Sequence, residues 1–424
     1  MNSVKTIMRM LETSIVMMVE LDVLRIMVGL ARLAYSAISS IICSLISLLF
    51  VFSCTNRSVE DYNFASADIK TEIIPQSNEL VLSDYFSNSE IIMFTGCVIS
   101  GIQQVLPYND SFIIGGKIKI SNTETSDLVA IFDRNGEYLR TLVRRGNGPN
   151  EMLNIRSMRI YEGILEVLGN YGGVLNKYDI NSGEIVESIN LQNTEIVYAA
   201  DFCKIESGKY LFYKNLSHSD SDEYKLYVFS TSQGIIDRYL PLDKKLAEIT
   251  SFAQKNNLSQ WGTDIYMFEV FAKGLYKYSS NDLNPYIGFN INNYTITDDI
   301  YNSKHKDLIS LVESCKESGY IWAHMDAFVD SNKYIISDFM HGTHKYLNVI
   351  DLNTYNSKSY NKIKDDLMLN ITYDITTNIL SLFNIYNNAY YCIIEPFLLQ
   401  SMLGKDINIK ISNDTNPILY ILHK

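Results

Sequence analysis

A pattern of two strands around a short turn recurs along this chain at nearly regular intervals. Each copy has two runs rich in β-branched and aromatic residues, as in 128–142, where Asn135-Gly136 separates the runs. Asn-Gly between alternating runs is a strong hairpin signal, because both residues tolerate a positive φ. Further copies lie at 176–186, 226–236, 274–283 and 346–354. Their turns open at positions 133, 179, 230, 279 and 351, so three intervals are nearly equal and the last is longer.

This spacing predicts an all-β fold, a six-bladed β-propeller. One propeller blade is a four-stranded sheet of about 40 to 50 residues, and the segment 79–424 is long enough for six of them. A β-sandwich with coincidental spacing is the alternative. The long interval contains 298–316, whose apolar spacing is helical and which ends before Gly319, so we expect one inserted helix. We also expect 418–422 to close the ring by pairing near the start of the propeller, which removes open sheet edges.

The composition agrees with a folded β protein and excludes one class of partner. The chain has 30 Tyr and 18 Phe, and it is 47% hydrophobic and 20% charged, which favours strands around a sizeable core. Its formal net charge is −12, whereas a nucleic-acid-binding surface needs clustered Lys and Arg. We therefore expect no nucleic acid partner.

An apolar segment near the amino terminus has the features of an export signal. Residues 37–52 are uncharged and mostly apolar, a run shorter than the roughly 20 residues of a membrane-spanning helix. The run ends at Val51-Phe52-Ser53-Cys54, which resembles a bacterial lipobox. This resemblance implies that the Cys54 thiol receives a diacylglyceryl group and that Cys54 becomes the first residue after cleavage. An uncleaved membrane anchor with an incidental cysteine is the alternative.

These signals divide the chain into three parts. Residues 1–53 are the expected signal peptide, and 1–26 contain three acidic residues, so translation from Met27 is an alternative start. Residues 54–78 are the expected lipidated tether, and 79–424 the propeller. We expect a cell-envelope protein, held by its lipid at the outer membrane.

Four cysteines remain after Cys54, and their spacing does not suggest a metal site. They are widely separated in the chain, without any C-x-x-C pair, so no zinc site and no other cofactor is expected. An exported protein meets an oxidising compartment, where disulfides between these cysteines are an alternative. Their apolar neighbours favour cysteines that are buried as small hydrophobic side chains. The four are Cys97, Cys203, Cys315 and Cys392.

A glycine-rich motif follows the first hairpin. The run Gly146-Asn147-Gly148-Pro149-Asn150-Glu151 resembles the G-x-G-P-x-E signature of the six-bladed β-propeller lipoproteins of Gram-negative bacteria, a TolB-like and NHL-like group. Residues 271–278 and 414–420 are similar to further segments of that group. The resemblance implies the fold and the envelope location, but no particular activity.

The motif itself is expected to be a crossing between two blades. Gly146 and Gly148 allow a positive φ, Pro149 fixes the following turn, and Glu151 can accept hydrogen bonds from backbone amides there. A phosphate-binding loop is the alternative, but the Lys and the Ser or Thr of such a loop are missing.

Histidines form the most site-like cluster in the sequence. His324, His341 and His344 lie close together in the chain and near Asp326 and Asp338, as ligands of a divalent metal could. On one strand, however, His341 and His344 would point to opposite faces, because side chains alternate. They converge only if Gly342 bends the chain. We favour a hydrogen-bonded structural role over a metal or catalytic one.

Two other groups are weaker candidates. An acidic run beside His218 could bind a cation, but it lacks the spacing of a calcium loop and is better interpreted as a solvated hairpin tip. Exposed tyrosines could stack on a ligand, although packing between blades explains most of them. The acidic residues are Asp220, Asp222 and Glu223, and the tyrosines are Tyr108, Tyr171, Tyr266 and Tyr386.

These observations favour a binding module over an enzyme. We expect a cell-envelope lipoprotein whose propeller binds a protein or a glycan, with the membrane as a further partner through the lipid. The alternative is a propeller-based lyase or hydrolase with a site at the mouth of the central channel. No catalytic residue is identified, because neither G-x-S-x-G nor H-E-x-x-H is present.

Overall fold

The structure is a computed structural model of the full chain. It describes residues 62–64, 67, 69–119, 127–148, 150–215, 223–242, 257–268, 273–290, 308–318, 321–330, 334–377, 380–397, 400 and 416–424. The chain divides into 1–58 and 59–424, and the first unit, with Cys54 and the expected signal peptide, lies outside the described residues.

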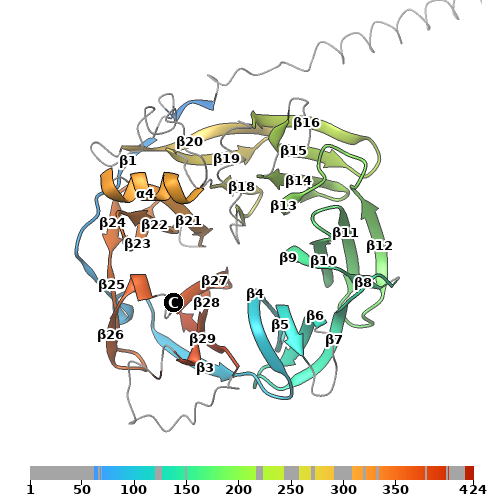
Figure 1. The fold of residues 1–424 in the computed structure, drawn as a ribbon, viewed down its shortest axis with the longest axis horizontal. Coiled ribbons are helices and arrows are strands. Elements are labelled where there is room, and N and C mark those ends of the chain that lie inside the picture. Colours follow the sequence, from blue (N-terminus) through green and yellow to red (C-terminus); the bar gives the residue numbers. More distant parts are fainter. Residues whose placement is uncertain are drawn as a thin grey trace, which may run out of the picture. The chain divides into compact units, whose positions relative to one another are not determined.

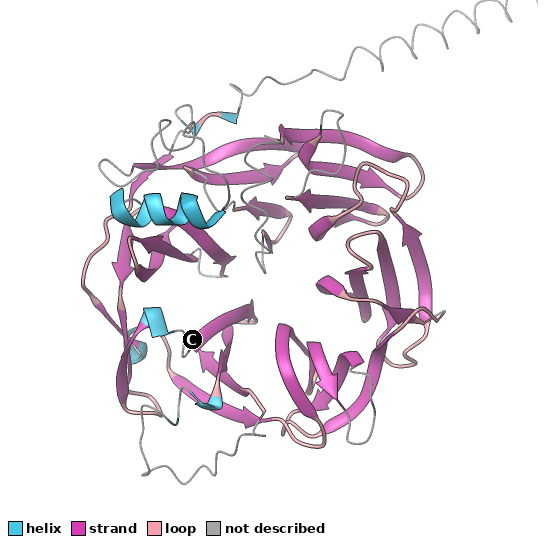
Figure 2. Cartoon of the chain, viewed as in Figure 1, coloured by secondary structure: helices cyan, strands magenta, loops and turns pink. Residues whose placement is uncertain are grey.

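The strands of the second unit form a β-propeller of seven sheets around a central axis (Figures 1 and 2). Two sheets have five strands: β4 (Val98–Tyr108), β5 (Ser111–Lys119), β6 (Asp127–Asp133), β7 (Tyr138–Arg145) and β8 (Glu151–Met152) in one, and β17 (Leu258–Trp261), β18 (Asp264–Met267), β19 (Gly274–Ser279), β20 (Asp282–Asn290) and β1 (Ile69–Glu72) in the other.

Four further sheets have four strands each: β9 (Ile155–Tyr161), β10 (Ile164–Gly169), β11 (Val174–Asp179) and β12 (Ile185–Asn190); β13 (Ala199–Glu206), β14 (Lys209–Lys214), β15 (Tyr224–Ser230) and β16 (Gly234–Pro241); β21 (Ile321–Val329), β22 (Tyr334–His341), β23 (His344–Asp351) and β24 (Ser357–Tyr360); β27 (Leu380–Tyr386), β28 (Ala389–Ile394), β29 (Ile418–His423) and β3 (Asn88–Met93). The last sheet has three: β2 (Glu79–Val81), β25 (Lys362–Asp365) and β26 (Ile371–Asp374).

The prediction of six blades is therefore wrong in number, since seven sheets are present. The additional sheet consists of the short hairpin β25–β26, which follows β24 in the chain, and of β2, which pairs with β25 in parallel. It packs into one hydrophobic cluster together with the sheets of β21–β24 and of β27–β29. The other six sheets each place one strand next to the axis, and β4, β9, β13, β17, β21 and β27 contact one another in succession.

The five hairpins expected from the sequence are present, and this prediction is confirmed. Each is an antiparallel pair at the outer side of its sheet, and the pairs are β6–β7, β11–β12, β15–β16, β19–β20 and β23–β24. In the first, Gly136 has a φ of 86°, which explains the glycine at that turn.

The core lies between neighbouring sheets. The middle strands are buried on both faces, as in β6, whose residues 128–132 are all buried, so these strands are continuous apolar runs. The outer strand β12 has four exposed positions out of six. A sheet covered on both sides needs apolar residues at every position, which accounts for the high content of aromatic and β-branched residues.

The ring closes between strands that are far apart in the sequence. β29 lies between β28 and β3, and Ile418 stands opposite Met93 in the antiparallel register. The expectation that 418–422 pair near the start of the propeller is confirmed.

The expected tether contains a strand of the propeller. β1 pairs in parallel with β20, so that Ile69 stands opposite Ile287 and Glu72 opposite Asn290. This part of 54–78 belongs to the propeller, because its backbone supplies hydrogen bonds to a sheet edge that would otherwise be open.

Helices are few among the described residues. α4 (Leu308–Ser318) overlaps the carboxyl-terminal part of 298–316, where the apolar spacing predicts an inserted helix, while residues 291–307 before it are not described. Two short 3-10 helices are η3 (Leu82–Asp84) and η4 (Ile375–Thr377). Of the helices in the described ranges, none is long and apolar enough to cross a membrane.

The glycine-rich motif is a crossing from β7 towards β9, as expected. The Gly148 amide donates to Oε2 of Glu151 at 2.8 Å, which is the hydrogen bond that the sequence predicts. The expected reason for the glycines is wrong, since neither Gly146 nor Gly148 has a positive φ. A Cβ atom at either position would instead collide with the Glu151 carboxylate. Pro149 lies outside the described residues.

Candidate functional site

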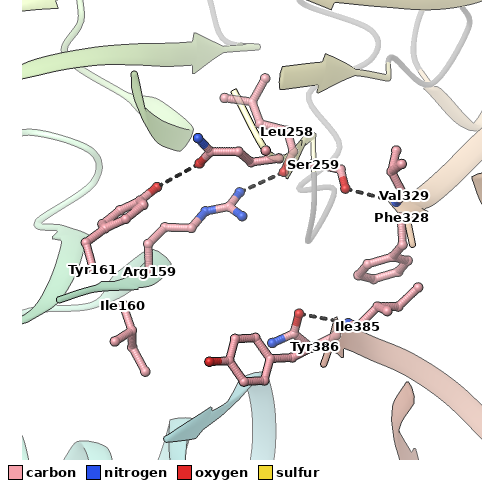
Figure 3. Close-up of a pocket in the computed structure, with 12 residues that line it drawn as sticks. Arg159, Ile160, Tyr161, Leu258, Ser259, Phe328, Val329, Ile385 and Tyr386 are labelled. Atoms are coloured by element: carbon pink, nitrogen blue, oxygen red, sulfur yellow. Dashed lines mark hydrogen bonds between the residues drawn. The ribbon is translucent and has the colours of Figure 1, made fainter. Parts of the chain in front are cut away.

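A cavity of about 450 Å³ lies on the axis of the propeller, where four inner strands end (Figure 3). Its walls come from the carboxyl-terminal halves of β9, β21 and β27, from the first three residues of β17 and from the turn after it. It is lined by Arg159, Ile160, Tyr161, Leu258, Ser259, Gln260, Gly262, Phe328, Val329, Asn384, Ile385 and Tyr386. Four sheets thus contribute to one site, although their inner strands are far apart in the sequence.

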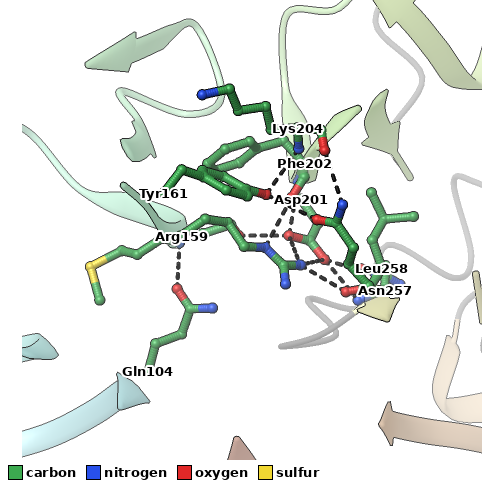
Figure 4. Close-up of polar contacts among 11 residues, drawn as sticks. Gln104, Arg159, Tyr161, Asp201, Phe202, Lys204, Asn257 and Leu258 are labelled. Carbon is green, nitrogen blue, oxygen red and sulfur yellow. Dashed lines mark hydrogen bonds and ion pairs between the residues drawn. The ribbon is translucent and has the colours of Figure 1, made fainter. Parts of the chain in front are cut away.

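A buried carboxylate, Asp201 on β13, holds three inner strands together (Figure 4). It is 2% exposed, and it accepts hydrogen bonds from the hydroxyl of Ser157 at 2.6 Å and from the amides of Asn257 and Leu258 at 3.1 and 2.9 Å. β9, β13 and β17 are therefore tied to one side chain. Such bonds between neighbouring sheets fix the spacing of the cavity walls.

Arg159 on β9 is the charged partner of Asp201. Its Nη2 atom donates to both Asp201 oxygens at 3.1 and 3.3 Å and to the Leu258 carbonyl at 2.7 Å, and its Nε donates to the Phe202 carbonyl at 3.0 Å. An arginine stays charged in proteins, so Asp201 and the carbonyls compensate a permanent cation at the wall of the cavity.

Tyr161 and Gln260 extend this bracing towards the opening. The Tyr161 hydroxyl accepts from the amide of Lys204 at 2.9 Å and donates to Gln260 Oε1 at 3.3 Å, while Gln260 Nε2 donates to the Lys204 carbonyl at 3.1 Å. Burial raises the pKa of Tyr161, so its phenol keeps the proton that it donates.

Side chains also join the inner strands elsewhere around the ring. Each of these bonds joins a side chain on one inner strand to the backbone of the next. The Met158 amide donates to Gln104 Oε1, the Val329 amide donates to the Ser259 hydroxyl, and Asn384 Nδ2 donates to the Val105 carbonyl. The amide and hydroxyl groups of the lining are thus largely engaged in holding the walls.

The opposite wall of the cavity is apolar and aromatic. Phe328 on β21 is buried, and Ile385 and Tyr386 lie at the end of β27 (Figure 3). Tyr386 is 50% exposed, which leaves one face of its ring accessible. One polar wall and one apolar wall are the usual composition of a small-molecule site.

Of the four tyrosines that the sequence singles out, one lines the cavity. Tyr386 does so, whereas Tyr266 is 3% exposed and packs between sheets. Tyr171 lies in the turn between β10 and β11, and Tyr108 ends β4. Position along the chain could not distinguish Tyr386 from the other three.

The histidine cluster has a different geometry from the one expected. His341 and His344 flank a two-residue turn and pair directly across the β22–β23 hairpin, because Gly342 adopts a φ of 58°. They therefore lie on the same face, which is the arrangement expected if Gly342 bends the chain and not the one expected on a single strand. His341 packs edge-on against Tyr346, and neither of these two histidines lines the cavity. The backbone of His324 pairs with that of Phe339.

Among the described residues, no three His, Cys, Asp or Glu side chains lie close enough to hold a metal ion. His218, Asp220 and Asp222 lie outside these residues. Glu223 is not part of a solvated tip, because it is 5% exposed and its Oε1 atom lies 2.6 Å from Nζ of Lys214. Its place at the start of β15 buries it against β14, which corrects the expectation for this residue.

The described cysteines are reduced and poorly reactive. Cys97, Cys203 and Cys392 are free thiols. Burial raises the pKa of Cys203 to about 12 and that of Cys97 to about 11, so neither is a thiolate near neutral pH. The side chain of Cys315 is not described.

A second buried carboxylate, Glu166 on β10, lies between the sheets of β9–β12 and β13–β16. It is 1% exposed; Oε1 accepts from the Tyr210 hydroxyl at 3.1 Å and lies 3.9 Å from Lys204 Nζ, whereas Oε2 has no hydrogen-bond partner in the described part of the chain. Burial raises the pKa of Glu166, and Lys177 and Lys204 oppose this shift.

We expect the effect of Glu166→Gln on stability to depend on pH. A carboxyl whose pKa is raised in the folded state stabilises the protein below its unfolded value of about 4.3, and this contribution is lost as the pH rises through the folded value. The free energy of unfolding of Glu166→Gln, minus that of the wild type, should therefore increase from pH 4 towards neutrality. Urea unfolding between pH 4 and 8 measures it, with the exposed Glu184→Gln as control. If the free energy of unfolding of Glu166→Gln minus that of the wild type decreased with rising pH, the pKa of Glu166 would not be raised in the folded protein.

Comparisons with known proteins agree with the fold. A family model described as a domain of unknown function, DUF4934, matches residues 64–423. The chain belongs to the DUF4934 family. No curated protein matches this DUF4934 chain. The family match leaves the resemblance to TolB-like and NHL-like lipoproteins as a prediction.

Solved structures similar to this DUF4934 protein have low sequence identity to it. One, a protein from Bacteroides fragilis NCTC 9343 provisionally named as exported, has a TM-score of 0.60 and 14% identity, over 84% of this chain and 99% of the other. At that identity the similarity concerns the fold alone. Virginiamycin B lyase from Staphylococcus aureus, at 7% identity over 79% of this chain and 99% of its own, has a TM-score of 0.39, too low to support an argument.

The residues that build the cavity of this DUF4934 protein were not among the sequence candidates, except Tyr386. Arg159 and Asp201 lie in strands β9 and β13 without any motif around them. One signal was available: Asp201 is the one charged residue within 199–203, and a charged residue among apolar neighbours is either paired or functional.

Proposed function

We propose that this protein is a cell-envelope lipoprotein, anchored through Cys54, whose propeller binds a protein or glycan ligand at the axial cavity. The observation that carries the binding role is the cavity itself. Four inner strands form it, one wall is polar and the other aromatic, and hydrogen bonds between neighbouring sheets hold it. A rigid site of this kind loses little conformational entropy when a ligand binds.

The alternative of a lyase or hydrolase has no specific observation in its favour. Among the described lining residues, Arg159 is the only one with an ionised side chain, and it is bound to Asp201. Acid–base catalysis needs a group that takes or gives a proton near neutral pH, and an arginine does not. We therefore propose binding.

The proposal is tested by capture of ligands with a matched pair of variants. Tyr386→Ala removes the exposed ring in the cavity, and Tyr171→Ala removes a ring of nearly the same exposure, 52% against 50%, outside it. Full-length wild type and variants are incubated with proteins and glycans of the cell envelope, and bound material is quantified. We expect capture to fall at least about tenfold for Tyr386→Ala alone, a loss of about 1.4 kcal/mol. Equal capture by the three proteins would refute a cavity-bound ligand.

Lipidation is tested separately with Cys54→Ala. Without the thiol no thioether can form, so we expect the variant to incorporate no labelled palmitate and to move from the membrane fraction to the soluble fraction. Cys97→Ala, a substitution within the propeller, is the control and should behave as the wild type. A Cys54→Ala protein that is still labelled and sedimented with membranes would disprove the anchor.

A further inference from the structure

The guanidinium of Arg159 is bound to protein on one side and open on the other. Its Nε and Nη2 atoms make all of its hydrogen bonds to the described residues, whereas Nη1, which carries two N–H groups, makes none (Figure 4). The side chain is 20% exposed and lines the cavity. A permanent cation therefore presents two unused donors to this space.

The side-chain amides of the lining are already partly used. Gln260 Oε1 accepts from Tyr161, and Asn384 Oδ1 accepts from the Ile385 amide at 2.8 Å. Their amide nitrogens each donate one hydrogen bond to a backbone carbonyl, so each side chain keeps one N–H group and one lone pair and adds no excess of acceptors. The phenol of Tyr386, by contrast, has no hydrogen bond to the described residues and is a further donor. The cavity thus offers donors in excess of acceptors.

The charge balance favours an acceptor with a single negative charge. Asp201 lies 3.1 Å from Nη2 of Arg159 and compensates most of the cation already. A doubly charged phosphate would bring a second negative charge close to Asp201 without a further cation in the described lining, and like charges at short range repel. One carboxylate can accept a charge-assisted hydrogen bond from an N–H group of Nη1 and brings only one negative charge.

We propose that the axial cavity recognises a carboxylate group on a small ligand, bound by Nη1 of Arg159, with the apolar part of that ligand against Tyr386 and Phe328. This inference rests on the proposed function, since it names the chemistry of the ligand at the same site. A cavity of about 450 Å³ accepts a ligand of the size of one or two sugar or amino-acid residues. The carboxylate can come from an acidic sugar or from an amino acid.

The experiment compares each carboxylate with a neutral partner of the same shape. Calorimetric titrations of the full-length protein use D-glucuronate against D-glucose, and N-acetyl-L-tyrosine against its amide, which separates the two sources. We expect at least one carboxylate to bind, and its neutral partner to bind at least tenfold more weakly. Equal binding within both pairs, or no binding of either carboxylate, would overturn the proposal. Capture that depends on Tyr386 would then still support a ligand of other chemistry.

Two variants connect the effect to the named atoms. Arg159→Gln should abolish the preference for the carboxylate, so that the carboxylate and its neutral partner bind with the same affinity. Because this variant leaves Asp201 without its cation and can impair folding, Tyr386→Phe serves as the second, since it removes only an exposed hydroxyl. We expect it to weaken carboxylate binding about threefold to tenfold. Tyr171→Phe is the control for Tyr386→Phe. Equal carboxylate affinities in the wild type, Arg159→Gln and Tyr386→Phe would overturn the assignment of the carboxylate site to Arg159 and Tyr386.

Discussion

Asp201→Ala is expected to lower the free energy of unfolding by at least about 4 kcal/mol. The substitution removes the carboxylate that balances Arg159 and leaves a buried cation, which costs about 3 to 5 kcal/mol. It also takes the acceptor from the amides of Asn257 and Leu258, and a buried amide without a partner costs about 1 to 3 kcal/mol. Urea unfolding followed by tyrosine fluorescence measures the difference.

Two comparisons isolate the cause. Asp201→Asn keeps the shape and one acceptor oxygen, so we expect a smaller loss than for Asp201→Ala. Asp110→Ala removes an exposed carboxylate and should change stability by no more than about 0.5 kcal/mol. If Asp201→Ala were as stable as Asp110→Ala, the bonds from β13 to β9 and β17 would not be what holds this side of the ring.

Lys214→Ala should be the second most harmful of these substitutions, with a loss of about 3 kcal/mol. Lys214 and Glu223 are 1% and 5% exposed, and their charged atoms are 2.6 Å apart. Removing the ammonium takes this cation from the buried Glu223 carboxylate, and breaking a buried ion pair is costly. Lys214 Nζ also donates to the Glu195 carbonyl at 3.1 Å, and this bond is lost as well.

An exposed ion pair on the same blade provides the control. Arg238 and Glu195 are also 2.6 Å apart, but their side chains are 34% and 43% exposed. Water solvates either partner alone, so Arg238→Ala should cost about 1 kcal/mol or less. The double variant Lys214→Met with Glu223→Leu should recover much of the stability, because it buries no charge. A double variant less stable than Lys214→Ala would contradict this account.

The sequence predicts those sheets whose strands are consecutive in the chain. The hairpins at 128–142 and 176–186 are recognisable because their two strands and the turn between them form one short segment, so local propensity determines them. The seventh sheet is not recognisable, because β2 joins β25 from the opposite end of the propeller sequence. A prediction from the number of residues per blade therefore places the segments of β2 and of β25–β26 in the other six blades.

The cavity could be predicted only in part for a similar reason. An exposed tyrosine can be expected from composition, but which of four tyrosines reaches the axis depends on where each inner strand ends. Arg159 and Asp201 meet because β9 and β13 are neighbours in the ring, and their positions along the chain carry no such information. Conversely, His341 and His344 look like ligands in the sequence, yet they flank a turn on a hairpin.

The pairing of β3 with β29 sets the order in which the protein can be completed. β3 is made before the strands β4 to β28, whereas its partner strand, Ile418–His423, is made after them. The sheets from β4 to β16 can form as their strands emerge, since each is local. The sheet of β27, β28, β29 and β3 cannot be completed until β29 is made. Until then β28 and β3 each have an edge without its partner strand. Until β29 is made, the unfinished chain therefore has two open strand edges, and this interval is when it is most prone to aggregation.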